Sequence, residues 1–306
     1  MPVIAPDPDG ATPARLRIVA AAILFSTGGA AIKACSLSGL QVACLRAGFA
    51  ALTLIAILPG ARRAASWSIR ALLVGVIYAA TMVLFVVANK LTTAANAIFI
   101  QAASPLFVLL LGPFALREPV RGRDLWFMLA LAAGMSLFFV GAEQPLASAP
   151  DPARGNLAAA AAAAAFALTV VGLRWAVRDS PGADSAALVA GNAIAFTACL
   201  PWALPLTGVG AADWGIAVFL GAIQIALAYT LLASGMKHVR ALDASLLLLV
   251  EPVLNPIWAW LAHGEHPGGL ALAGGAVILA ATAAHSRAAG RAGGTHPSRA
   301  PRLDAP

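Results

Sequence analysis

Charged residues are scarce in this sequence, and their scarcity sets the class of protein. Of 306 residues, only 11% are Asp, Glu, Lys or Arg, whereas 60% are hydrophobic. So little polar material cannot cover the surface of a water-soluble globule. The composition therefore predicts an all-α protein embedded in a lipid bilayer.

Nucleotide-binding and metal-binding patterns are missing as well. No GxxxxGK[ST] loop occurs, so any uphill transport is expected to draw on an ion gradient. The three cysteines have no CxxC spacing, which indicates neither a zinc site nor a redox pair. In "HGEH", His263, Glu265 and His266 are metal-ligating types, but no third histidine or cysteine lies nearby. We expect no cofactor and no metal.

Long apolar segments are what the sequence has instead. A membrane-spanning helix needs about 20 mostly apolar residues, and ten such segments occur between clusters of Arg, Pro, Gly and Asp. They are 16–33, 39–59, 70–89, 94–115, 125–142, 156–176, 185–206, 213–235, 242–262 and 268–286. Residues 1–15 are Pro-rich and acidic, which predicts a disordered cytoplasmic segment rather than a signal peptide. Residues 143–155 are expected to form a periplasmic connecting loop, and 287–306 a disordered basic tail.

The basic residues predict the topology of these spans. The formal charge is +7, but it is spread over short loops rather than gathered on one face, so nucleic acid is not an expected partner. With a cytoplasmic N-terminus, sixteen basic residues fall inside: Arg15, Arg17, Arg62, Arg63, Arg70, Arg117, Arg121, Arg123, Arg174, Arg178, Lys237, Arg240, Arg287, Arg291, Arg299 and Arg302. Lys33, Lys90 and Arg154 fall outside. This bias predicts a multi-pass protein of a bacterial-type inner membrane with both termini in the cytoplasm.

The two halves of the chain are related by an offset of 147 residues. The offset aligns "ANKLTTAANAIFIQAASPLFVLLLGPFALRE" with "GMKHVRALDASLLLLVEPVLNPIWAWLAHGE" and brings together the pairs Lys90 and Lys237, Pro105 and Pro252, and Glu118 and Glu265. The charge bias places the members of each charged pair on opposite sides of the membrane. Five spans per half is an odd number, so the halves must insert with inverted orientation, as in many secondary transporters.

Several motifs in this order resemble the EamA type of the drug/metabolite transporter superfamily. "LFSTGGAAIK" is similar to its first span, and "LRAGFAAL" to the Arg-containing start of its second. "SPLFVLLLGPFALRE" with "LALAAGMSLFFVG", and "ALDASLLLLVEPVLNPIWAWLAHGE" with "LALAGGAVILA", resemble its fourth and fifth spans in each half. The resemblance implies two five-helix repeats, 16–142 and 156–286, forming a carrier of small metabolites that is often an exporter.

Glu251 is an acid near the middle of the ninth predicted span. An ionised carboxylate at that depth costs about 3 kcal/mol. It shares a helical stripe with Asn255 and Trp258, which predicts a face turned toward protein or water. Pro252 and Pro256 each free a backbone carbonyl on the same helix. We expect Glu251 to line a substrate cavity, where it pairs with a cation or exchanges a proton; the alternative is a neutral Glu251 that only holds a kinked helix.

Other polar side chains are candidates for the same cavity. The offset pairs Ser104 with Glu251, and Gln101 lies one turn before Ser104. Tyr78 and Tyr229, one in each half, offer an apolar ring with a hydroxyl that suits an amphipathic solute. Gln224 belongs with them, although stripes of this kind also arise from ordinary helix packing.

Arg46 and Lys33 are the cationic candidates. Together they are suited to attract an anionic group of the substrate, such as a carboxylate, which with Glu251 would make a site for a zwitterion. The alternative for each is that the long side chain extends to the outer membrane interface.

These features predict a secondary active transporter of an amino acid, drug or related organic solute, exporting by alternating access with protons as the candidate coupling ion. A membrane-embedded enzyme would need converging acids, a Ser with a His, or metal ligands at one depth. The predicted spans hold one acid near the midplane, so an enzyme is the second hypothesis and a non-transporting scaffold or sensor the third. The oligomeric state is not indicated.

Overall fold

The computed structural model describes residues 8–63, 66–115, 122–140, 145–178, 182–239 and 241–293. Within these ranges the chain is helical apart from short joints and one isolated bridge between Leu146 and Ala149. Ten stretches of the described residues are long and apolar enough to cross a membrane: Thr12–Ala34, Gly39–Ile57, Ile69–Leu91, Ala94–Pro113, Gly122–Val140, Pro152–Val177, Ala183–Ala203, Ala211–Met236, Asp243–His263 and Gly269–Ala289. The predicted all-α fold with ten spans is confirmed.

Four of the spans are interrupted helices. In chain order the elements are α1 (Pro8–Ser26), α2 (Gly28–Ala34), α3 (Gly39–Ile57), the 3₁₀ turn η1 (Pro59–Arg62), α4 (Ile69–Leu91), α5 (Ala94–Ala102), α6 (Ser104–Ala115), α7 (Gly122–Val140), α8 (Pro152–Val177), α9 (Ala183–Ala203), α10 (Ala211–Val218), the π-helical segment η3 (Phe219–Leu227), α11 (Ala228–Met236), α12 (Ala241–Leu248), α13 (Val250–His263) and α14 (Gly269–Gly293). The first span breaks between α1 and α2, the fourth between α5 and α6, and the ninth between α12 and α13. The eighth contains η3.

The breaks in spans four and nine have a common cause. Pro105 and Pro252 lack an N–H, so the carbonyls of Gln101 and Leu248, four residues earlier, lose their helical partner. The helix tightens just before each proline. In span four, the N–H of Ala103 donates to the carbonyl of Ile100 at 3.1 Å. In span nine, the N–H of Leu249 donates to the carbonyl of Leu246 at 3.2 Å. The two halves thus break at almost equivalent positions.

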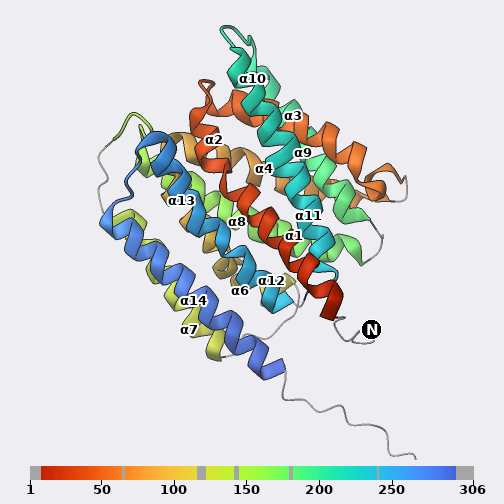
Figure 1. The fold of residues 1–306 in the computed structure, drawn as a ribbon, viewed down its shortest axis with the longest axis vertical. Coiled ribbons are helices and arrows are strands. Elements are labelled where there is room, and N and C mark those ends of the chain that lie inside the picture. Colours follow the sequence, from red (N-terminus) through yellow and green to blue (C-terminus); the bar gives the residue numbers. More distant parts are fainter. Residues whose placement is uncertain are drawn as a thin grey trace, which may run out of the picture.

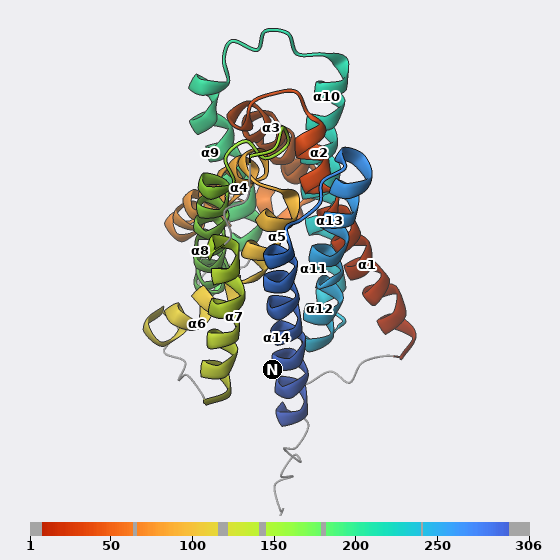
Figure 2. The ribbon, with the colours of Figure 1, turned by 90° about the vertical axis from the view of Figure 1, so that its left-hand side faces the viewer.

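The halves of the protein exchange their first helices (Figures 1 and 2). The helix α1, which opens the first half, packs against α11, α12 and α13 of the second half, whereas α8, which opens the second half, packs against α4, α5 and α6 of the first. The last helices of the two halves, α7 and α14, lie side by side along one edge. The start of α1 and the end of α14 lie at the same end of the bundle, as an even number of spans requires.

The ends of the chain are more helical than expected. Helix α1 begins at Pro8, inside the segment 1–15 that was predicted to be disordered, and α14 continues to Gly293, beyond the predicted tail boundary at 287. Alanine and arginine favour helix wherever nothing interrupts them, so α14 continues past its apolar stretch. Helix α8 likewise begins at Pro152, inside the predicted loop 143–155. Residues 1–7, 143–144 and 294–306 lie outside the described residues.

Candidate functional site

A cavity of about 660 Å³ lies between the two halves. Its polar and charged lining residues are Arg46, Gln101, Ser104, Arg174, Gln224, Tyr229, Ser245, Glu251, Thr282, His285 and Ser286. Arg174 lies in the last turn of α8, and His285 lies toward the end of α14. We call this side of the molecule the Arg174 end. The opposite side, where α2 ends and α14 begins, is the Lys33 end.

The cavity wall repeats the internal symmetry of the chain. Seven pairs of its lining residues are related by the 147-residue offset: Met82 and Tyr229, Phe85 and Leu232, Ile98 and Ser245, Gln101 and Leu248, Ala102 and Leu249, Ser104 and Glu251, and Pro105 and Pro252. They come from the third and fourth spans of each half. The cavity therefore occupies the interface of the repeats, which is where carriers built from inverted repeats hold their substrates.

Glu251 is in the first turn of α13, directly after the break in span nine, and lines the cavity. No hydrogen bond or ion pair reaches its carboxylate from the part of the chain that the structure describes. The start of a helix favours a negative charge, and Ser104 occupies the matching first turn of α6. Gln101, the other polar candidate in span four, also lines the cavity.

Arg46 is on α3 and is 4% exposed. Its Nη2 donates to Oε1 of Gln224 at 3.2 Å, whereas Nε and Nη1 are buried without an acceptor among the described residues. Gln224, on η3, is held in turn by its Nε2, which donates to the carbonyl of Phe25 at 3.1 Å. Arg46 therefore stays inside the bundle and does not extend to the outer interface.

The two tyrosines lie one behind the other. Tyr229 lines the cavity, with its ring edge-on to Phe25 at a centroid distance of 5.0 Å. Tyr78 is 1% exposed and packs behind Tyr229 with the ring centroids 6.2 Å apart. The structure thus places Tyr229 on the cavity wall and Tyr78 in the layer behind it.

Asn255 and Trp258 face the first span rather than the cavity. Asn255 is fully buried against Gly29, where an added Cβ would lie 2.7 Å from its Oδ1. Trp258 donates its indole N–H to the hydroxyl of Ser26 at 2.9 Å. The stripe predicted from Glu251 does turn toward protein, but only Glu251 reaches the cavity.

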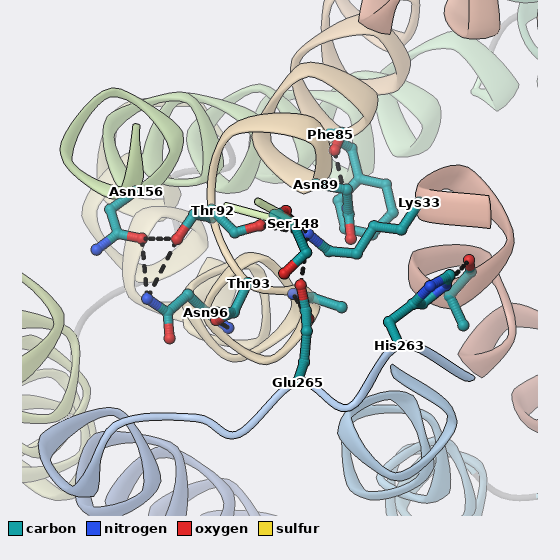
Figure 3. A network of polar contacts seen from close by, with 12 residues as sticks. Lys33, Phe85, Asn89, Thr92, Thr93, Asn96, Ser148, Asn156, His263 and Glu265 are labelled. Atoms are coloured by element: carbon teal, nitrogen blue, oxygen red, sulfur yellow. Dashed lines mark hydrogen bonds and ion pairs between the residues drawn. The ribbon is translucent and has the colours of Figure 1, made fainter. Parts of the chain in front are cut away.

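Lys33 is paired with an acid at the opposite end (Figure 3). Its Nζ lies 2.8 Å from Oε1 of Glu265, and donates to the carbonyls of Thr92 at 2.8 Å and Ser148 at 2.5 Å. The other oxygen of Glu265 accepts the N–H of Ala94, at the start of α5, at 2.9 Å. Both charged side chains are almost completely buried, at 3% and 2% exposure. Lys33 and Arg46 are therefore not brought together.

Asparagine and threonine side chains extend this arrangement. Oδ1 of Asn156 accepts the hydroxyl of Thr92 at 2.8 Å and the amide of Asn96 at 3.2 Å, and its Nδ2 donates to the carbonyl of Phe138 at 2.7 Å. We call Lys33, Thr92, Asn96, Asn156 and Glu265 the Lys33 cluster. It joins spans one, three, four and six to the connection between spans nine and ten.

Several of these functional candidates were not predicted from the sequence. Arg174 and His285 line the cavity, but the sequence analysis used Arg174 only to predict the topology and did not select His285. The partnership of Lys33 with Glu265 was also missed, although the charge bias placed both residues on the same side of the membrane. Their position on the same side of the membrane was the feature of the sequence that could have suggested this ion pair.

Comparisons with known proteins agree with this architecture. The EamA-like transporter family matches residues 13–140 and 153–286, one match for each half. An uncharacterized transporter of Archaeoglobus fulgidus is 36% identical over 83 residues, which is 27% of this chain and 30% of that protein. A solved structure titled "Crystal structure of protein" has the same fold, with a TM-score of 0.61 and 23% identity over 92% of this chain and 99% of that one. The chain belongs to the EamA-like transporter family.

Proposed function

We propose that this protein is a proton-coupled secondary transporter that exports a small organic solute by alternating access, with Glu251 as the proton-carrying group. Membership of a transporter family supports the movement of small solutes across a membrane. The observation that carries the finer proposal is the carboxylate of Glu251, which faces the cavity between the halves without a partner among the described residues.

An acid without a partner suits proton exchange better than a scaffold role. A purely structural Glu251 would hydrogen-bond one of the carbonyls freed by the prolines, and no such bond occurs in the described part of the protein. The cavity supplies access for water, and the charged or titratable groups that share it are Arg46, Arg174, Tyr229 and His285. None of these four is within ion-pair distance of Glu251. Glu251 is thus free to bind and release a proton as the cavity changes sides.

The end of the bundle that is closed supports a proposal for how the protein is oriented in the membrane. The cavity lining continues to Arg174, His285 and Ser286, whereas the Lys33 cluster ties several spans together at the other end. We propose that the Arg174 end is cytoplasmic, in agreement with the excess of basic residues expected there. The structure would then be an inward-facing state, ready to load a solute for export. Both termini would lie in the cytoplasm of a bacterial-type inner membrane.

Transport by proteoliposomes tests this proposal. Purified protein is reconstituted with an imposed pH gradient and offered a panel of radiolabelled amino acids, sugars and organic cations. We expect substrate movement against its gradient in the wild type, and loss of this proton-driven movement in Glu251→Gln together with a flattened pH profile. The matched control is Asp184→Asn, an exposed acid in the first turn of α9, which should behave as wild type. Equal rates and equal pH profiles in Glu251→Gln and wild type would refute Glu251 as the coupling group.

A further inference from the structure

We infer that Arg46 binds the acidic head of the transported solute, and that this solute is an organic monoanion, a carboxylate attached to an apolar body. The inference rests on the proposed transport function and names the substrate class of the same cavity. Its basis is the geometry around Arg46, which leaves a permanent cation with unused hydrogen-bond donors on the cavity wall.

Among the described residues, the guanidinium of Arg46 has no counter-charge. The part of the chain that the structure describes brings no carboxylate within ion-pair distance of it, and its single hydrogen-bond partner is the neutral amide of Gln224. Nε and Nη1 remain buried without acceptors. Because arginine cannot discard its charge, an uncompensated guanidinium at 4% exposure is costly. An oxyanion arriving in the cavity would supply both the missing charge and the missing acceptors.

Gln224 holds the guanidinium ready for this anion. Its Nε2 is committed to the carbonyl of Phe25, in the last turn of α1, so its Oε1 is directed at Arg46. The packing is tight, because a Cβ at Gly28 would lie 2.7 Å from this Nε2. Gln224 also lies on the π-helical segment η3, a local distortion that is frequent at functional sites. An arginine held in this way loses little conformational freedom when the solute binds.

The rest of the wall defines the body of the solute. Apart from its polar side chains the lining is aromatic and aliphatic, with Phe25, Met82 and Phe85 among its residues. A volume of about 660 Å³ is in the range of cavities that hold small organic molecules. One guanidinium with two unused nitrogens matches a monoanionic carboxylate better than a phosphate dianion, which would need further cationic donors. An amphipathic carboxylate satisfies both the polar and the apolar parts of this wall.

Arg46 and Glu251 remain separate in this arrangement. They line the same cavity, yet no ion pair within 4.0 Å joins them. Glu251 therefore does not neutralise Arg46 or fill its donor sites. The anion site and the proposed proton site are able to act as two independent positions in one cavity.

Ligand binding by the purified protein in nanodiscs tests the inference without requiring transport. The probes are 3-phenylpropionate, its uncharged amide 3-phenylpropanamide, phenyl phosphate and acetate, titrated by isothermal calorimetry. We expect 3-phenylpropionate to bind, acetate and phenyl phosphate to bind more weakly, and the amide not to bind measurably. Arg46→Gln should weaken 3-phenylpropionate binding by about 10- to 100-fold, the loss of one or two charge-assisted hydrogen bonds, and Arg46→Lys should weaken it less.

A second variant keeps the test decisive if Arg46→Gln folds poorly. Gln224→Glu places a carboxylate where Oε1 now contacts Arg46, so it should occupy the guanidinium and abolish anion binding while preserving the fold. Arg154→Gln removes the same charge from an exposed position and should bind like the wild type. Equal binding of the amide and the acid, no carboxylate binding by the wild type, or wild-type affinity in both Arg46→Gln and Gln224→Glu would overturn the inference. Binding without transport would instead refute the proposed function alone.

Discussion

The charged residues Lys33 and Glu265 and the charged residues Arg46 and Glu251 form two pairs whose surroundings differ completely. Lys33 and Glu265 lie 2.8 Å apart, and each is further satisfied by backbone groups. Arg46 and Glu251 line one cavity without touching, and within the described residues Arg46 has one neutral partner and Glu251 has none. The first pair is complete by itself, whereas the second has no counter-charge among the described residues.

The difference follows from the cost of burying charge. Removing an ion from water costs several kcal/mol, about as much as a well-placed partner returns. The Lys33 cluster meets that condition and so needs no water, which is consistent with a closed end. Unpaired charges persist only where water or a ligand reaches them. We therefore expect charge pairing to distinguish the end that we propose to close from the cavity that we propose to bind the solute.

Breaking the Lys33 pair should have the largest effect. Lys33→Met or Glu265→Gln alone leaves a buried charge unpaired and should lower the free energy of unfolding in detergent by about 3–5 kcal/mol. The double variant Lys33→Met/Glu265→Gln should lose much less than the sum of the two. Lys237→Met is the control, because Lys237 is exposed and is the residue that the 147-residue offset aligns with Lys90. Its free energy of unfolding should be close to that of the wild type. Additive losses in the double variant would contradict the pairing.

Asn156 should come next in effect. Asn156→Leu leaves the hydroxyl of Thr92 and the carbonyl of Phe138 without their partner in a buried region, and should cost about 1–3 kcal/mol. Thermal unfolding in detergent measures the loss. A stability equal to the wild type would show that this network does not hold the Lys33 end together. Asn255→Leu is the matched control, because it makes the same replacement at an asparagine whose side-chain amide has no partner in the described structure.

Much of the fold could be predicted from the sequence because lipid enforces it. Ten apolar stretches of about 20 residues allow few alternatives, and the 147-residue offset that revealed the repeat also relates seven pairs of residues on the cavity wall. A proline within a span also indicates a local helix break, and the breaks at Ala103 and Leu249 follow from Pro105 and Pro252. These features depend on local chemistry or on the bilayer, so they are visible without tertiary structure.

The candidate site was only partly predictable from the sequence. Helical spacing shows which residues share one face of a helix, but it does not show which residues that face contacts. The stripe through Glu251 and Asn255 faces inward, yet Asn255 packs against Gly29 of α2, whereas Glu251 lines the cavity. The Lys33 to Glu265 contact joins residues 232 positions apart, so no periodicity indicates it. In span eight, η3 changes the helical repeat around Gln224, and nothing in the local sequence marks that change.

Neutralising Arg46 or Glu251 should change the stability of the protein in the opposite direction from breaking the Lys33 pair. Arg46→Gln and Glu251→Gln each remove a charge that has no counter-charge among the described residues, so each should leave the ligand-free stability unchanged or raise it by about 1 kcal/mol. Thermal unfolding in detergent without added solute is the measurement. A loss of stability comparable to that of Lys33→Met would mean that the cavity charges are satisfied internally, and the contrast between the two pairs would fail.

Asn255→Leu should have the smallest effect of all. Both polar atoms of the Asn255 amide are buried without a partner in the described structure, and leucine has nearly the same branched shape. Replacing an unsatisfied amide removes no hydrogen bond, so the free energy of unfolding should stay within about 0.5 kcal/mol of the wild type. Asn156→Leu involves the identical chemical change, and any difference between the two variants measures hydrogen bonding rather than volume. Equal losses in both would show that Asn255 has partners near the break between α1 and α2, and that burial alone does not distinguish paired from unpaired groups in this bundle.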